Sequence, residues 1–201
     1  MTLAHATEEA VYGWWTRPDV DSPRMWDTWL APHREHLLQA LEGAPFTSLF
    51  EVGCGAGPNL RRIRQHYPAL RLGGSDCNAT HAAWCQSQGL DVAQRSLPHA
   101  VGPEWDVTVT CFACTYVPRR HVEQFLATCQ SQALIVMEPW GRGEWISPKR
   151  QTTPRFYHPW HDMTQATGWR LDWRWPIPPA DDVTSLAIFH KTPKASGDAH
   201  Q

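Results

Sequence analysis

The chain has 201 residues, a formal net charge of −2 at pH 7 and a mixture of 42% hydrophobic and 19% charged residues. This length suits one domain with a sizeable core, and the near-neutral charge disfavours an extended phosphate-binding surface. No apolar run is long enough to cross a bilayer and no signal-peptide pattern opens the chain, so we expect no membrane attachment. The six cysteines lack the spacing of a disulfide scaffold, which favours a cytoplasmic location.

The N-terminal segment is predicted to be a helical arm or lid over residues 1–45, belonging to the same domain as the rest. Apolar side chains recur at helical spacing over residues 24–41, and Pro32 should kink this helix or divide it in two. The main domain is expected at 46–193, followed by a disordered tail at 194–201.

Short apolar runs alternate with helical patterns through the middle of the chain. We expect strands at 48–53, 70–76, 90–94, 106–111 and 133–137, and helices at 58–67, 79–88 and 121–129. Strands that alternate with helices form right-handed crossovers and a parallel sheet. The predicted class is therefore α/β, doubly wound, with helices on both faces of the sheet.

The C-terminal part differs in composition. Residues 141–160 are rich in Gly, Pro, Arg and aromatic residues, which predicts a long functional loop. A short helix at 161–167 should follow, then strands at 169–175 and 185–191 with no helix between them. These two strands should pair as an antiparallel hairpin, which completes a seven-stranded, mostly parallel sheet.

The most informative segment is the glycine-rich run over residues 50–60, Phe-Glu-Val-Gly-Cys-Gly-Ala-Gly-Pro-Asn-Leu. Glycines that follow a buried strand let the backbone turn sharply and approach a ligand, and the next helix offers unpaired N–H groups. A dinucleotide-binding loop needs a third glycine where Pro58 stands, and no Lys-Ser/Thr follows as in a P-loop. Both of those ligand classes are disfavoured, and a nicotinamide dehydrogenase stays a minor alternative.

This run resembles the first motif of class I S-adenosylmethionine (SAM)-dependent methyltransferases, Glu/Asp-x-Gly-x-Gly-x-Gly. Glu51, Gly53, Gly55 and Gly57 fill its defined positions. Asp76 lies where family members carry the acidic residue that binds both ribose hydroxyls, and a carboxylate can accept two such hydrogen bonds. Residues 105–118 and 133–139 resemble the family's fourth and fifth strands, so the resemblance covers about 48–139.

The resemblance implies a Rossmann-like methyltransferase fold with SAM as the cofactor. The residues that it places at the cofactor are Glu51, Gly53, Cys54, Gly55, Gly57, Asn59, Asp76, Cys77, Asn78, Ser96, Leu97 and Cys111. The sequence departs from the family after the third strand, where Arg95 stands in place of a frequent Asp. Ser96 and Leu97 are the residues expected to meet the adenine.

The sequence indicates the residues that contact the methyl acceptor less clearly than those that contact the cofactor. The candidates for catalysis are Tyr116, His158 and His161, and those for substrate binding are Trp14, Trp15, Tyr116, Tyr157 and Trp160. Arg17 could join the two N-terminal tryptophans in a lid and meet a carboxylate. The alternatives are that Tyr116 packs beneath the cleft and that both histidines are structural. No cluster of Asp, Glu or His near the predicted cleft indicates a metal.

We therefore expect methyl transfer from SAM to a small-molecule acceptor by direct displacement, in a monomer or homodimer. The amide-binding Asn/Asp-Pro-Pro-Tyr/Phe element is absent after the fourth strand, which disfavours methylation of adenine N6 or of glutamine. Two alternatives stay open. In the first, the chain is a SAM-binding partner subunit with little activity of its own. In the second, it methylates structured RNA through its clustered arginines.

Overall fold

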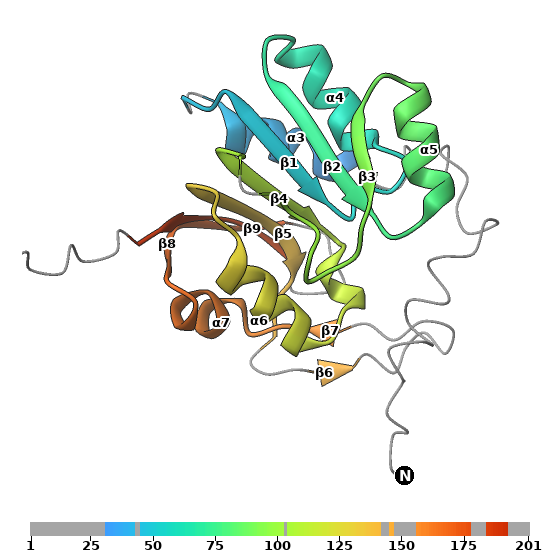
Figure 1. Cartoon of the computed structure of the whole chain (residues 1–201). Coiled ribbons are helices and arrows are strands. Elements are labelled where there is room, and N and C mark those ends of the chain that lie inside the picture. Colours follow the sequence, from blue (N-terminus) through green and yellow to red (C-terminus); the bar gives the residue numbers. More distant parts are fainter. Residues whose placement is uncertain are drawn as a thin grey trace, which may run out of the picture.

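The computed structural model describes residues 31–42, 45–102, 104–141, 145–146, 156–177 and 184–192. One sheet is made of β1 (Ser48–Val52), β2 (Arg71–Asp76), β3 (Asp91–Gln94), β4 (Val107–Cys111), β5 (Ala133–Pro139), β8 (Trp169–Pro176) and β9 (Thr184–Lys191). Their spatial order is β3-β2-β1-β4-β5-β9-β8 (Figure 1). The first five strands pair in parallel, and β9 is antiparallel to both of its neighbours. The predicted seven-stranded sheet with its closing hairpin is confirmed.

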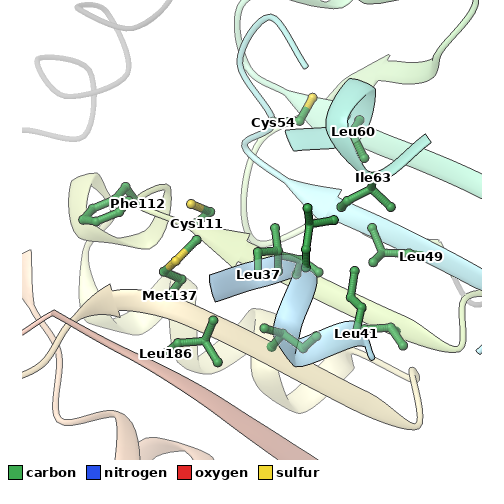
Figure 2. Packing of buried hydrophobic residues seen from close by; sticks show 14 of the residues in the cluster. Leu37, Leu41, Leu49, Cys54, Leu60, Ile63, Cys111, Phe112, Met137 and Leu186 are labelled. Atoms are coloured by element: carbon green, nitrogen blue, oxygen red, sulfur yellow. The ribbon is translucent and has the colours of Figure 1, made fainter. Parts of the chain in front are cut away.

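Helices cover both faces of this sheet (Figure 1). The helices are α3 (Ala31–Leu41), α4 (Pro58–His66), α5 (Ala79–Ser87), α6 (Arg119–Thr128) and α7 (Trp160–Ala166). Leu37, Leu60 and Cys85 place α3, α4 and α5 on one apolar cluster, part of which Figure 2 shows. Phe125 and Trp160 place α6 and α7 on a second cluster at the opposite face. The sheet is thus doubly wound, as predicted.

The central strands are apolar because both of their faces are covered. All five residues of β4 are buried, and so are all seven of β5, which is the pattern of parallel strands in α/β proteins. The register places Val52 beside Ser75 and Thr110. The segments that follow β1, β2 and β4 therefore emerge together at one edge of the sheet, where ligands bind in open α/β folds.

The predicted kink or division at Pro32 is not tested, because the part of the predicted helix before Ala31 lies outside the described residues. One predicted boundary is corrected: α6 begins directly after Pro118, two residues before the predicted start, because a proline at this point costs no helical hydrogen bond. A short 3-10 helix, η1 (Cys114–Tyr116), was not predicted.

The region predicted as one long loop contains regular structure in its described part. The two-residue strands β6 (Trp145–Ile146) and β7 (Phe156–Tyr157) pair antiparallel, and Trp140 forms a bridge with His158. The helix α7 then begins at Trp160, inside the predicted loop. Residues 1–30 of the arm predicted at 1–45, and the tail predicted at 194–201, lie outside the described residues. Among the helices that are described, none is both long and apolar enough to span a bilayer.

Candidate functional site

A cleft that is open to solvent lies at the carboxyl ends of β1, β2 and β4, with about 820 Å³ of empty space that includes part of the solvent at its mouth. The predicted site residues that line it are Glu51, Gly53, Cys54, Gly55, Asp76, Cys77, Ser96, Leu97, Cys111 and Tyr116. The glycine loop, the end of β2, the segment after β3 and the segment after β4 thus meet at one cavity.

The glycine loop forms one wall of the cleft, and two of its glycines are required by geometry. Gly53 has φ +64°, and a Cβ at this position would overlap the Cβ of Ala113. Gly55 has φ +54°, and a Cβ added there would have no other atom of the described residues within 4 Å, so this residue faces open space in the cleft. Only glycine adopts such left-handed backbone without strain. The loop therefore leaves room for a ligand at Gly55 while Gly53 lets the opposite wall approach.

Asp76, at the end of β2, holds the glycine loop in place. Its Oδ2 accepts a hydrogen bond from the Gly55 N–H at 2.8 Å. Its Oδ1 accepts from the Asn78 N–H at 2.9 Å and lies 3.4 Å from Nδ1 of His81. Asp76 is only 8% exposed yet lines the cleft. Its carboxylate is therefore oriented by the protein and still faces the cavity.

Glu51 is a buried carboxyl group with unmet hydrogen-bonding capacity. Its Oε1 accepts from Nδ2 of Asn59 at 2.6 Å. Within the described part of the chain, neither Oε2 of Glu51 nor Oδ1 of Asn59 has a hydrogen-bond partner. Burial raises the pKa of Glu51 to about 8, against the opposing effect of the Asn59 hydrogen bond. A carboxyl group of this kind suits a cationic ligand group, because the positive charge replaces lost hydration.

The pKa of Glu51 makes the stability of the protein depend on pH. A carboxyl group with a folded pKa near 8 and an ordinary value of 4.5 binds its proton more tightly in the folded state. Its contribution to stability is fully present below pH 4.5 and is lost as the pH rises through 8, by about 1.4 kcal/mol per pH unit at most. Glu51→Gln keeps a neutral group of the same shape. We expect this variant to lose clearly less stability than wild type between pH 5.5 and pH 8.5, measured by urea unfolding. Parallel losses in the two proteins would show that Glu51 is not the group that titrates.

A second buried carboxyl group, Glu138, organises the opposite wall of the cleft. Its Oε1 accepts from the hydroxyl of Thr110 at 2.6 Å and from the N–H groups of Ala113 and Cys114 at 2.9 and 3.0 Å. Its Oε2 accepts from the N–H of Thr115 at 3.1 Å. Burial raises the pKa of Glu138 to about 7, although these hydrogen bonds favour the charged form. Glu138 thereby fixes the turn between β4 and η1, which carries Tyr116.

The two candidate catalytic histidines do not line the cleft. His158 is fully buried, and its Nε2 lies 2.9 Å from the carbonyl oxygen of Cys114, which identifies Nε2 as the donor. His161 is exposed in the first turn of α7. Tyr157 and Trp160 are buried, Trp160 within the apolar cluster under α6 and α7. The structural role that was the alternative for His158 is the one that its geometry supports.

Three of the predicted cofactor residues lie behind the lining. Gly57 caps α4 and packs against Cys85 and Leu90, Asn59 supports Glu51, and the side chain of Asn78 caps α5 by accepting from two backbone N–H groups. Trp14, Trp15 and Arg17 lie outside the described residues. The lining residues that were not predicted as site residues are Val52, Pro58, His81, Arg95, Ala100, Phe112, Ala113 and Val117. Arg95 was noted only as a departure from the family pattern. No group of three or more potential metal ligands occurs among the residues described.

Solved structures with the same architecture include methyltransferases. Comparison with protein-family models and with curated protein sequences finds no match. The 1,6-didemethyltoxoflavin-N1-methyltransferase of Burkholderia thailandensis, solved with 1,6-didemethyltoxoflavin and S-adenosylhomocysteine, superimposes with a TM-score of 0.72 at 13% identity, over 96% of this chain and 92% of that one. An O-methyltransferase of a Brevibacillus brevis trans-AT PKS multienzyme, solved with S-adenosyl-L-homocysteine, gives 0.66 at 9% identity, over 85% and 76%. Human N-acetylserotonin methyltransferase in complex with SAM gives 0.64 at 15%, over 84% and 54%.

These identities are low, so the likeness establishes the fold. The chain has the Rossmann-like fold of SAM-dependent methyltransferases, with its cleft at the carboxyl edge of the sheet.

Proposed function

We propose that this protein is an enzyme that binds SAM in the cleft and transfers its methyl group to a small molecule with an apolar or aromatic part. The observation that carries this proposal is the hydrogen bond from the Gly55 N–H to Asp76, two residues that both line the cleft. It joins the glycine loop to the acidic end of β2, in a fold whose solved examples include methyltransferases bound to SAM or S-adenosylhomocysteine.

The cleft residues fit the parts of SAM. Gly55 leaves space beside the loop for the methionine portion, and the unsatisfied Oε2 of buried Glu51 suits its ammonium group. Asp76 provides a carboxylate for the ribose. Cys77 and Leu97 offer apolar contact for the adenine, and Ser96 offers a hydroxyl. Cys111 lies at the end of β4, beside the region where the reacting groups would meet.

Methyl transfer from SAM requires the protein mainly to position the reacting groups. Bound SAM supplies a methyl carbon made electrophilic by the sulfonium. The chain contributes by aligning the acceptor with that carbon and by excluding water from the cleft. The rigid turn held by Glu138 serves this task, because it fixes Ala113 and Tyr116 at the cleft wall. A general base is required only for an acceptor that keeps its proton near neutral pH.

The part of the cleft lining that follows β4 is apolar. Phe112, Ala113, Tyr116 and Val117 form it, and Ala100 also lines the cleft. Among these side chains only Tyr116 carries a polar group, so they suit a flat, weakly polar molecule. This supports a small-molecule acceptor over a charged macromolecule.

The RNA alternative gains little from the described arginines. Arg61 donates to the carbonyl of Ala56, Arg62 forms an ion pair with Glu35 at 2.9 Å, and Arg64 donates to Gln88 and Gly89. The side chains of these three arginines therefore form hydrogen bonds and an ion pair within the protein. The partner-subunit alternative rests on Trp173 and Trp175, which stack on each other and are 42% and 52% exposed on the edge strand β8.

The test is release of S-adenosylhomocysteine from SAM in the presence of a panel of small aromatic and alicyclic compounds carrying hydroxyl, thiol or amine groups. We expect turnover with at least one class. Tyr116→Ala should raise the KM for that acceptor about tenfold, through loss of aromatic contact, while the affinity for S-adenosylhomocysteine stays within about twofold. Turnover with RNA transcripts alone, or binding of SAM with no turnover across the panel, would favour the corresponding alternative.

A further inference from the structure

Glu51 lines the cleft, yet the protein encloses its carboxyl group almost completely. The side chain is only 2% exposed, and its Oε1 accepts a hydrogen bond from Nδ2 of Asn59 at 2.6 Å. Within the described residues, Oε2 has no hydrogen-bond partner and the carboxyl group has no ion-pair partner. A buried carboxylate with a single neutral partner is costly, so Glu51 keeps its proton until a cation binds beside it.

The thiol groups around Glu51 are neutral and do not compensate a charge on it. Cys54, in the glycine loop, and Cys85, in α5, both donate to the carbonyl oxygen of Gly55, at 3.6 and 3.5 Å, and therefore keep their hydrogens. Burial raises the pKa of Cys111, at the end of β4, well above its ordinary value. Three elements thus face Glu51 with uncharged sulfur groups.

Two charged residues act on Glu51 in opposite directions. Burial is the main cause that raises the pKa of Glu51 to about 8, and the hydrogen bond from Asn59 opposes it. The negative charge of Asp76, from β2, raises the pKa further, and the positive charge of Arg34, from α3, lowers it. The effect of Arg34 is the smallest of these, so it does not overcome the cost of burial.

We infer that the ammonium group of the cofactor displaces the proton of Glu51, so that each binding event forms a carboxylate and releases one proton to solvent. This inference rests on the proposed function and makes the affinity of the cleft depend on pH. The ammonium group keeps its own protons, and its positive charge compensates the carboxylate. Because the carboxyl group must lose its proton on binding, the affinity should rise as the pH rises toward 8.

The experiment is calorimetric titration of the full chain with S-adenosylhomocysteine at pH 7, in phosphate and in Tris, two buffers with different enthalpies of ionisation. The difference between the two observed enthalpies gives the number of protons released. We expect about 0.9 proton per ligand, the protonated fraction at pH 7 of a group with a pKa of about 8. The affinity should be about tenfold higher at pH 7 than at pH 6.

A second probe tests whether the ammonium group is the part of the ligand that displaces the proton. It is the analogue of S-adenosylhomocysteine in which hydrogen replaces the amino group. Wild type should bind this analogue with almost no proton release and without the gain in affinity between pH 6 and pH 7. Equal proton release by the parent and the analogue would overturn the inference. This comparison needs no variant, so it holds even if a substitution at Glu51 prevents folding.

Two variants assign the proton to a residue. Glu51→Gln keeps a neutral group of the same shape, and it should bind S-adenosylhomocysteine without proton release and with affinities at pH 6 and pH 7 that agree within about twofold. Glu104→Gln is the control, because the side chain of Glu104 is 78% exposed and does not line the cleft. It should match wild type in both measurements. Thermal unfolding without ligand shows whether each variant is folded.

The failure of this inference differs from the failure of the proposed function. Proton release that persists in Glu51→Gln would assign the proton to another group of the cleft, such as His81, and would overturn the role of Glu51. Binding to wild type without proton release would also overturn it, and both results leave the proposed function standing. Failure of wild type to bind S-adenosylhomocysteine at any pH between 6 and 8 would overturn the proposed function and this inference with it.

Discussion

Gly53→Ala is expected to destabilise the protein by about 3 kcal/mol and to weaken S-adenosylhomocysteine binding at least tenfold. The left-handed backbone at Gly53, with φ +64°, costs an alanine about 1 kcal/mol. The overlap of the new methyl group with the Cβ of Ala113 adds roughly 1–3 kcal/mol. Because Ala113 is fixed by the hydrogen bond of its N–H to Glu138, the turn cannot yield easily. The two walls of the cleft should therefore be forced apart at the point where they are closest.

The matched control is Gly168→Ala. Gly168 also has a left-handed backbone, with φ +79°, but no atom of the described residues lies within 4 Å of a Cβ there, and it does not line the cleft. We expect it to lose only the backbone contribution of about 1 kcal/mol and to bind the ligand as wild type does. Urea unfolding and calorimetry measure both quantities. Equal stability losses in the two variants would contradict the close packing of Gly53 against Ala113.

The sheet could be predicted well because its signals are local. Buried apolar runs such as β4 and β5, each preceded or followed by a helical pattern, determine parallel strands without knowledge of distant contacts. The hairpin of β8 and β9 followed from the absence of a helix between them. An error falls where a proline sets the start of a helix, at Pro118.

More of the residues predicted for the cofactor than of those predicted for the acceptor line the cleft. The glycine loop and Asp76 are adjacent to strand ends, so the sequence pattern fixes their place in the fold. By contrast, Glu138 accepts hydrogen bonds from N–H groups 23 to 25 residues away in the sequence, and His158 donates one to a carbonyl group 44 residues away. Nothing in the local sequence distinguishes these buried supporting groups from reactive ones. His81 was missed because its partner lies across the turn between β2 and α5, although its position three residues after the capping Asn78 was a usable signal.

Asp76→Ala is expected to lower the affinity for S-adenosylhomocysteine at least about 100-fold. Hydrogen bonds to a charged group contribute roughly 1.5–3 kcal/mol each, and one such bond to the ribose is lost. The variant also releases the Gly55 N–H, which positions the glycine loop beside the ligand. Asp91→Ala is the control, because Asp91 is exposed at the start of β3, away from the carboxyl edge, and does not line the cleft. It should bind the ligand as tightly as wild type, with both affinities taken from the same calorimetric titration.

The central claim is that the cleft binds SAM, and the most direct test is calorimetric titration of the wild-type protein with S-adenosylhomocysteine, with NADH as a comparison ligand. We predict micromolar binding of S-adenosylhomocysteine, no binding of NADH, and loss of the signal in Asp76→Ala but not in Asp91→Ala. No heat with S-adenosylhomocysteine at protein concentrations well above the micromolar range would contradict the claim, and the glycine loop would then serve another ligand.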